Sequence, residues 1–161
     1  MNERDEVAEA IGRLLVERGE TIGVAESSAG GLIAAALLGV AGASQFFKGG
    51  AVVYNADGKQ RLTGITPEAL EVARPSTEQH TALLARAIQE RLGSTWAVAE
   101  TGAAGPTGNR YGDAAGHAAL GVSGPIERTT TIETGDNDRR ANMEAFALAA
   151  LKLLRGAIES A

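Results

Sequence analysis

The fold is decided by one stretch near the N-terminus, which reads Thr21-Ile-Gly-Val-Ala-Glu-Ser-Ser-Ala-Gly-Gly-Leu-Ile-Ala-Ala-Ala-Leu-Leu38. Its first five residues, 21–25, are a short apolar run that predicts a buried strand, and the apolar run 32–38 predicts a helix. The residues between them are small or polar, and two consecutive glycines permit a tight turn. A strand that leads through such a loop into a helix is typical of α/β proteins.

The chain on either side of this stretch continues the alternation of helices and strands. Apolar residues at helical spacing predict a first helix over about residues 5–18, ended by Gly19. Later helices are expected after the Thr66-Pro67 cap, after a capping box over Ser76–Gln79, and from about Asp138. Buried strands are predicted at residues 50–54, 95–99, 115–122 and 127–133, the last two joined as a hairpin. We therefore predict a single three-layer α/β/α domain with a mixed, mostly parallel sheet and a late antiparallel hairpin.

Composition and charge exclude several classes of function. The 161 residues are 44% hydrophobic and 22% charged, as in a soluble globular protein of one domain. The chain has no cysteine and two histidines, so we expect no disulfide, no thiolate nucleophile and no metal site. A net charge of −5 has the wrong sign for a nucleic-acid partner or an anionic membrane surface. The longest apolar run, residues 32–40, is too short to span a bilayer, and we expect a cytoplasmic protein.

Three polar loops follow predicted strands at their carboxyl ends. They are residues 26–31, 54–59 and 100–108. In open α/β sheets ligands bind beyond this edge, so the three loops together predict a ligand site. The backbone N–H groups of Gly30 and Gly31, at the start of a helix, suit an anion. The alternatives are a simple helix cap for the first loop and a plain turn for the third. Both histidines, His80 and His117, are expected to be structural.

Five motifs in order resemble the CinA C-terminal domain family. They are Ala25-Glu-Ser-Ser-Ala-Gly-Gly-Leu32, Gly42-Ala-Ser44, the segment from Gly50 to Tyr54 with Lys59, Thr101-Gly-Ala-Ala-Gly-Pro106, and Gly135-Asp136. The resemblance covers nearly the whole chain and identifies residues 1–161 as a single domain of this kind, similar to the stand-alone form. The family includes amidohydrolases that convert nicotinamide mononucleotide to nicotinate mononucleotide and ammonia.

The resemblance implies a nucleophilic serine assisted by a lysine. Matched by motif, the nucleophile is Ser44, the base is Lys59, and Tyr54 supports proton transfer or orients the lysine. A lysine can serve as a base when burial or a nearby cation lowers its pKa from about 10.4 towards 7. The residues expected to bind substrate are Ser27, Gly30, Gly31, Thr101, Gly102 and Arg140, with Arg139 as the alternative to Arg140.

This chain departs from the usual family pattern in two loops. Ser28 and Ala29 stand where the family usually has Cys and Thr, and residues 108–116 replace a Lys-Pro-Val-Gly run. The resemblance implies a small nucleotide as substrate and no cofactor. Ala- and Gly-rich helix faces suit a homo-oligomer, for which we expect a dimer. The alternative functions are a nucleotide- or phosphate-binding module without turnover and a competence- or damage-associated interaction protein.

Overall fold

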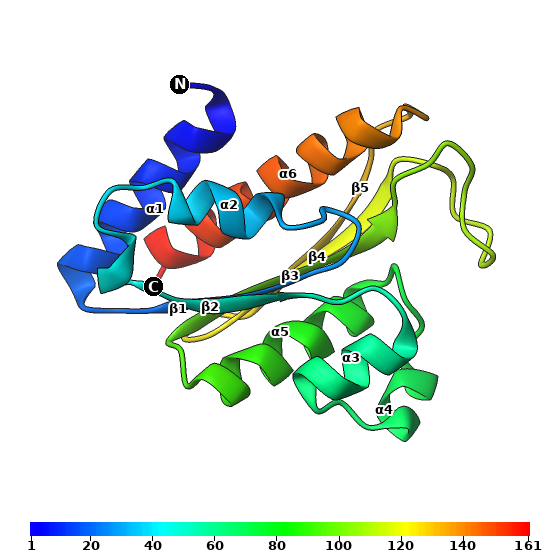
Figure 1. Cartoon of the computed structure of the whole chain (residues 1–161), viewed down its shortest axis with the longest axis horizontal. Helices are drawn as coiled ribbons and strands as arrows, with labels where there is room; N and C mark the ends of the chain where they lie inside the picture. Colours follow the sequence, from blue (N-terminus) through cyan, green and yellow to red (C-terminus); the bar gives the residue numbers. More distant parts are fainter.

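The computed structural model describes residues 1–161 as a five-stranded sheet with helices on both faces (Figure 1). The strands are β1 (Ile22–Glu26), β2 (Phe47–Val52), β3 (Trp96–Ala103), β4 (His117–Ser123) and β5 (Arg128–Glu133). The helices are α1 (Glu3–Arg18), α2 (Leu32–Leu38), α3 (Ala56–Thr63), α4 (Pro67–Val72), α5 (Glu78–Leu92) and α6 (Arg139–Glu159), with a 3-10 turn η1 (Ala43–Gln45). The predicted α/β/α domain is confirmed.

The strands lie in the order β2-β1-β3-β4-β5. β1 pairs in parallel with β2 and with β3, whereas β4 pairs antiparallel with β3 and with β5. The sheet is thus divided evenly between the two kinds of pairing, and it is less parallel than we predicted. The inner strand β1, between β2 and β3, is buried along its whole length, because helices cover both of its faces.

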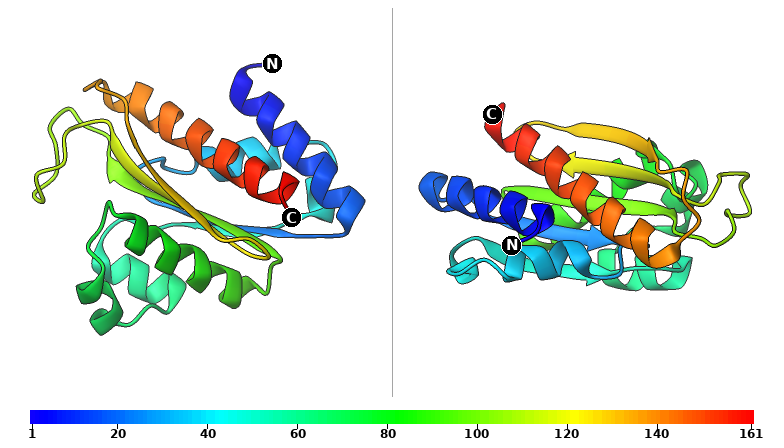
Figure 2. Two further views of the ribbon diagram at one scale, coloured as in Figure 1. Left: turned by 180° about the vertical axis from the view of Figure 1, so that it is seen from behind. Right: turned by 90° about the horizontal axis from the view of Figure 1, so that it is seen from above.

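Two hydrophobic clusters hold the layers together. On one face α1, α2 and α6 pack over the sheet, and Figure 2 shows α1 and α6 side by side. The larger cluster lies here and includes the buried side chains of Ile11, Trp96 and Phe146. On the other face α5 packs on the sheet with α3 and α4 beside it, around a smaller cluster that includes Leu84 and Ile88.

Several boundaries differ from the sequence predictions, and three of these differences lie close to the strand ends where a ligand site was expected. β3 runs on through Ala103, because its last four residues pair with β4, so the expected loop at 100–108 begins only after the strand. β2 ends at Val52, which leaves Tyr54 outside the strand. The cap of α5 is Thr77, whose hydroxyl accepts a hydrogen bond from the His80 N–H at 3.2 Å, and Ser76 precedes the cap. None of the helices combines the length and the apolar character needed to cross a membrane.

Candidate active site

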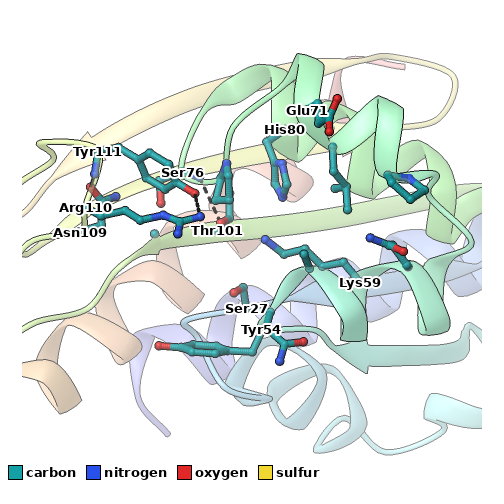
Figure 3. Close-up of a pocket in the computed structure, with 17 residues that line it drawn as sticks. Ser27, Tyr54, Lys59, Glu71, Ser76, His80, Thr101, Asn109, Arg110 and Tyr111 are labelled. Carbon is teal, nitrogen blue, oxygen red and sulfur yellow. Dashed lines mark hydrogen bonds between the residues drawn. The ribbon is translucent and has the colours of Figure 1, made fainter.

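A polar pocket of about 570 Å³ opens at the carboxyl ends of the parallel strands (Figure 3). Its volume is in the range of small-molecule sites. The side chains that line it come from the loops after β1 and β2, from α3, α4 and α5, from the end of β3, and from the loop between β3 and β4. Of the predicted site residues, the pocket lining contains Ser27, Tyr54, Lys59, Thr101 and Gly102.

Ser27 and Lys59 are buried side chains without partners in the protein. Ser27 is 7% exposed and Lys59 is 3% exposed, and both line the same cavity. Neither the Ser27 Oγ atom nor the Lys59 Nζ atom makes a hydrogen bond or ion pair in this structure. Lys59 lies in α3, not in the loop where we expected it, and the Asn55 side chain caps this helix. The lysine is therefore presented to the pocket from a regular helix.

The surroundings of Lys59 favour its neutral form. Burial lowers the pKa of the Lys59 amine, and the Glu100 carboxylate opposes part of this shift. An amine with a depressed pKa can accept a proton near neutral pH, as a general base must.

The loop that carries Ser27 is shaped by a carboxylate from the end of β1. Glu26 is fully buried and accepts hydrogen bonds from the backbone N–H groups of Gly31, Ile33 and Ala34 at 2.9, 3.1 and 2.9 Å. The protein's own side chain thus occupies the N-terminus of α2. The predicted anion site at Gly30 and Gly31 is wrong for this reason, and neither glycine lines the pocket.

A second buried carboxylate holds the other end of the same loop. Glu100 accepts hydrogen bonds from the N–H groups of Ser27 and Ala29 at 3.0 and 2.8 Å, and from the Ser28 hydroxyl at 2.6 Å. Burial raises the pKa of Glu100 to about 7. The charge of Glu26 also raises this pKa, whereas the three hydrogen bonds lower it. Within residues 27–31, only the Ser28 N–H remains without a hydrogen bond.

Ser44 lies away from the pocket. It is exposed in η1, ahead of β2, whereas the pocket is reached from the other end of that strand. The six residues of β2 separate the two ends by about 20 Å at 3.3 Å per residue. The expected convergence of Ser44 with Lys59 is therefore not found, and Ser27 is a serine that shares the pocket with Lys59.

The rim of the pocket carries a tyrosine and an arginine that touch. Tyr54 is 65% exposed, and its hydroxyl accepts a hydrogen bond from Arg139 at 3.3 Å. Arg139 also donates to the Gly105 carbonyl at 2.6 Å. Arg140, which we predicted as the substrate ligand, makes no hydrogen bond or ion pair and does not line the pocket. Arg139, the first arginine of α6, does not line the pocket either, but it contacts Tyr54, which does.

Thr101 and Gly102 enter the pocket from the end of β3. The Thr101 hydroxyl accepts a hydrogen bond from the Ser76 N–H at 3.3 Å and so ties the start of α5 to the strand. Ser76 has a φ of 64°, a left-handed conformation that is uncommon for a residue with a side chain. Gly102 has no room for a side chain, because a Cβ atom there would lie 2.6 Å from the His117 carbonyl oxygen.

His80 was expected to be structural, yet it lines the pocket. It is fully buried, and its Nδ1 atom lies 2.9 Å from the Ala73 carbonyl oxygen, so Nδ1 carries the proton. Burial, with the nearby Lys59, lowers the pKa of His80 to about 4. The ring is therefore neutral at neutral pH, and its unprotonated Nε2 atom has no partner.

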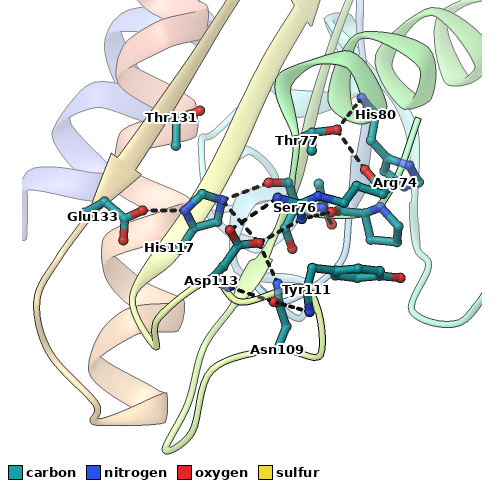
Figure 4. A network of polar contacts seen from close by, with 12 residues as sticks. Arg74, Ser76, Thr77, His80, Asn109, Tyr111, Asp113, His117, Thr131 and Glu133 are labelled. Carbon is teal, nitrogen blue, oxygen red and sulfur yellow. Dashed lines mark hydrogen bonds and ion pairs between the residues drawn. The ribbon is translucent and has the colours of Figure 1, made fainter. Parts of the chain in front are cut away.

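A network around His117 holds the β3–β4 loop against the pocket (Figure 4). The two ring nitrogens lie against the Glu133 carboxylate and the Ser76 carbonyl oxygen, the latter at 2.8 Å. Both partners are acceptors, so both nitrogens donate and the ring is an imidazolium. Burial disfavours that charge, but these contacts and the nearby Asp113 outweigh it and raise the pKa of His117. Asp113 in turn pairs with Arg74 at 2.8 Å.

This network places three further residues in the pocket, namely Asn109, Arg110 and Tyr111. The guanidinium groups of Arg74 and Arg110 lie over the Tyr111 ring. Their Cζ atoms are 5.0 and 5.1 Å from the centre of the ring. The loop belongs to the segment in which this chain departs from the usual family pattern. The sequence offered no periodicity here from which its position could be predicted.

A family model described as the CinA C-terminal domain matches residues 4–158. The chain belongs to the CinA C-terminal domain family. A CinA-like protein of Synechocystis sp. is 37% identical over 138 residues, which are 86% of this chain and 33% of that protein. A CinA-like protein of Chlorobium phaeobacteroides is 37% identical over 158 residues, or 94% of this chain and 37% of that protein. The chain thus spans about a third of the length of the curated CinA relatives that it matches.

Solved CinA structures share the fold. A competence-damaged protein (CinA) superfamily protein from Klebsiella pneumoniae 700603 superimposes with a TM-score of 0.92 at 25% identity, over 100% of both chains. The competence/damage inducible protein CihA from Agrobacterium tumefaciens gives a TM-score of 0.87 at 29% identity, over 97% of this chain and 96% of that one. The fold of this chain is therefore shared with solved CinA superfamily proteins.

Proposed function

We propose that this chain is an amidohydrolase that deamidates nicotinamide mononucleotide to nicotinate mononucleotide and ammonia. The observation that carries the proposal is that Ser27 and Lys59, both buried and without a side-chain partner, line one pocket. Its substrate comes from the resemblance to a family that includes such deamidases. A serine hydroxyl is a weak nucleophile until a base takes its proton, and the only lysine in the pocket is Lys59.

In the proposed mechanism the neutral Lys59 amine removes the proton of the Ser27 hydroxyl. The Ser27 oxygen attacks the carboxamide carbon, and the amide oxygen becomes an oxyanion. The Ser28 N–H, the residue after the nucleophile, is the available backbone donor for that charge. Protonated Lys59 then gives its proton to the departing nitrogen, which is released as ammonia. The acyl group remains bound to the Ser27 oxygen as an ester. Water, activated by the same amine, hydrolyses the ester to release the acid.

The rim supplies candidate contacts for the rest of the nucleotide. Arg139 and Arg110 bring positive charge to the side of the pocket where Tyr54 and Tyr111 lie. Guanidinium groups bind phosphate oxygens in a bidentate manner, and tyrosine rings pack on ribose or pyridine. We assign the 5′-phosphate to this rim and the carboxamide to the buried end, beside Lys59.

The test is ammonia release from nicotinamide mononucleotide by the purified chain, with nicotinate mononucleotide identified as the product. Nicotinamide riboside, which lacks the phosphate, is the matched control and should be the poorer substrate. Thermal stabilisation by the nucleotide without any turnover would overturn the proposal in favour of a binding module. Neither stabilisation nor turnover would favour an interaction protein.

A further inference from the structure

The buried carboxylate of Glu100 is placed to act on both members of the proposed pair. It is fully buried at the end of β3, directly below the turn that carries Ser27. Three donors from consecutive residues converge on it: the Ser27 N–H at 3.0 Å, the Ser28 hydroxyl at 2.6 Å and the Ala29 N–H at 2.8 Å. A carboxylate with this many partners fixes the backbone on which the Ser27 side chain stands.

The charge of the same carboxylate also acts on the pKa of Lys59. The pocket that Lys59 lines also holds Glu71 of α4, Tyr54, and Arg110 and Tyr111 of the β3–β4 loop. Glu26 lies beside Glu100 as its register partner on β1, Lys59 projects from α3, and His80 faces the pocket from α5. Glu26 is committed to the N-terminus of α2, and His80 is neutral. The charge of Glu100 opposes the lowering of the Lys59 pKa by burial.

We propose that Glu100 is the positioning residue of the site, which orients the Ser27 turn and stabilises the protonated form of Lys59. This inference rests on the proposed function. Its first part predicts that moving the carboxylate misplaces Ser27. Its second part predicts that removing the charge makes Lys59 a weaker base that loses its proton at lower pH.

Two substitutions separate these parts. Glu100→Gln keeps the length of the side chain, so the amide oxygen can still accept from the Ser27 and Ala29 N–H groups while the charge is gone. Glu100→Asp keeps the charge and withdraws the carboxylate from the turn by one methylene. Glu26→Gln is the matched control, because it removes the neighbouring buried carboxylate that holds α2 instead.

The activity readout is the pH profile of kcat/KM. In Glu100→Gln the acid limb should move to lower pH by about 1 unit, as expected for loss of a nearby opposite charge. In Glu100→Asp the limb should stay in place, and kcat should fall about tenfold or more because the nucleophile is displaced. An acid limb that does not move in Glu100→Gln would overturn the role of the charge towards Lys59. Full activity in Glu100→Asp would overturn the role in orienting the Ser27 turn.

A second readout does not depend on activity. The chain has three lysines, at positions 48, 59 and 152, so ¹³C-lysine labelling gives three Cε signals, and Lys59→Met assigns the one from the pocket. The Lys59 titration midpoint should fall by about 1 unit in Glu100→Gln and stay unchanged in Glu26→Gln. The same signal in the parent should also respond as Glu100 changes its protonation state, because burial raises the pKa of Glu100 to about 7. Absence of both effects would overturn the proposal, whereas absence of ammonia release with both effects present would overturn only the proposed function.

Discussion

Lys59→Met should stabilise the folded protein at neutral pH. Burial lowers the pKa of Lys59 in the folded protein, partly offset by Glu100, whereas in the unfolded chain the amine titrates near 10.4. The folded state therefore binds this proton less tightly than the unfolded chain does. Below the folded-state pKa, folding is penalised by about 1.4 kcal/mol for each pH unit that separates the two pKa values. Met removes the charge and occupies the space of the lysine stem, so it removes this penalty.

The sign of the effect sets its pH dependence. The gain in the free energy of unfolding should be largest below the folded-state pKa of Lys59. It should shrink as pH rises towards about 10.4, where the parent amine is neutral in both states. Urea denaturation of parent and variant between about pH 6 and about pH 10 measures this difference. Over the same range, deamidation by the variant should be at least about a hundredfold slower, the contribution of a general base.

The matched control is Lys48→Met, because Lys48 is an exposed lysine outside the pocket. It should change neither the pH dependence of stability nor the rate. Two results would refute the reasoning. One is a stability difference between Lys59→Met and the parent that is flat with pH. The other is deamidation by a correctly folded Lys59→Met within a few-fold of the parent rate.

Three further predictions concern the rim and the network. Arg139→Ala should raise the KM for nicotinamide mononucleotide about tenfold, and Arg140→Ala should leave it unchanged, in the ammonia assay. Glu133→Gln should lower the melting temperature below about pH 6.5 and lose this effect as pH rises through the raised pKa of His117. The loss in the free energy of unfolding should stay under about 1 kcal/mol, because the Glu133 side chain is 58% exposed. Asp138→Ala removes the side chain that caps α6 and should cost about 1 kcal/mol in urea denaturation.

Local patterns were enough to predict most of the fold. The helix over 32–38 was predicted with its observed bounds, and the Thr66 cap was predicted correctly, because spacing and capping chemistry act within a few residues. The extension of β3 to Ala103 could not be predicted in the same way. Its last residues have no apolar pattern, and they are strand only because β4 lies beside them.

The site was predictable in part. The motif and the strand-end loops brought Ser27, Lys59 and Thr101 into the prediction, and all three line the pocket. Ser44 was chosen by its place in a motif, and the direction of β2, which puts it at the opposite edge, is a tertiary property.

The buried carboxylates escaped notice because each was assigned to a loop. One signal could have found them. Two predicted strands end with the same residue type, Glu26 after the first and Glu100 after the third. Adjacent parallel strands place such residues side by side, and a buried carboxylate needs donors. The nearest donors are the N–H groups of the Ser27 loop. The anions that this loop binds are therefore the protein's own carboxylates, Glu26 and Glu100.

The central claim is that Ser27, and not Ser44, is the nucleophile of an amide hydrolysis in this pocket. The most direct test is kcat/KM for ammonia release from nicotinamide mononucleotide, measured on Ser27→Ala and Ser44→Ala beside the parent. Ser27→Ala should lose at least about a hundredfold, and Ser44→Ala should stay within a few-fold of the parent. Full activity in Ser27→Ala, or a hundredfold loss confined to Ser44→Ala, would contradict the account.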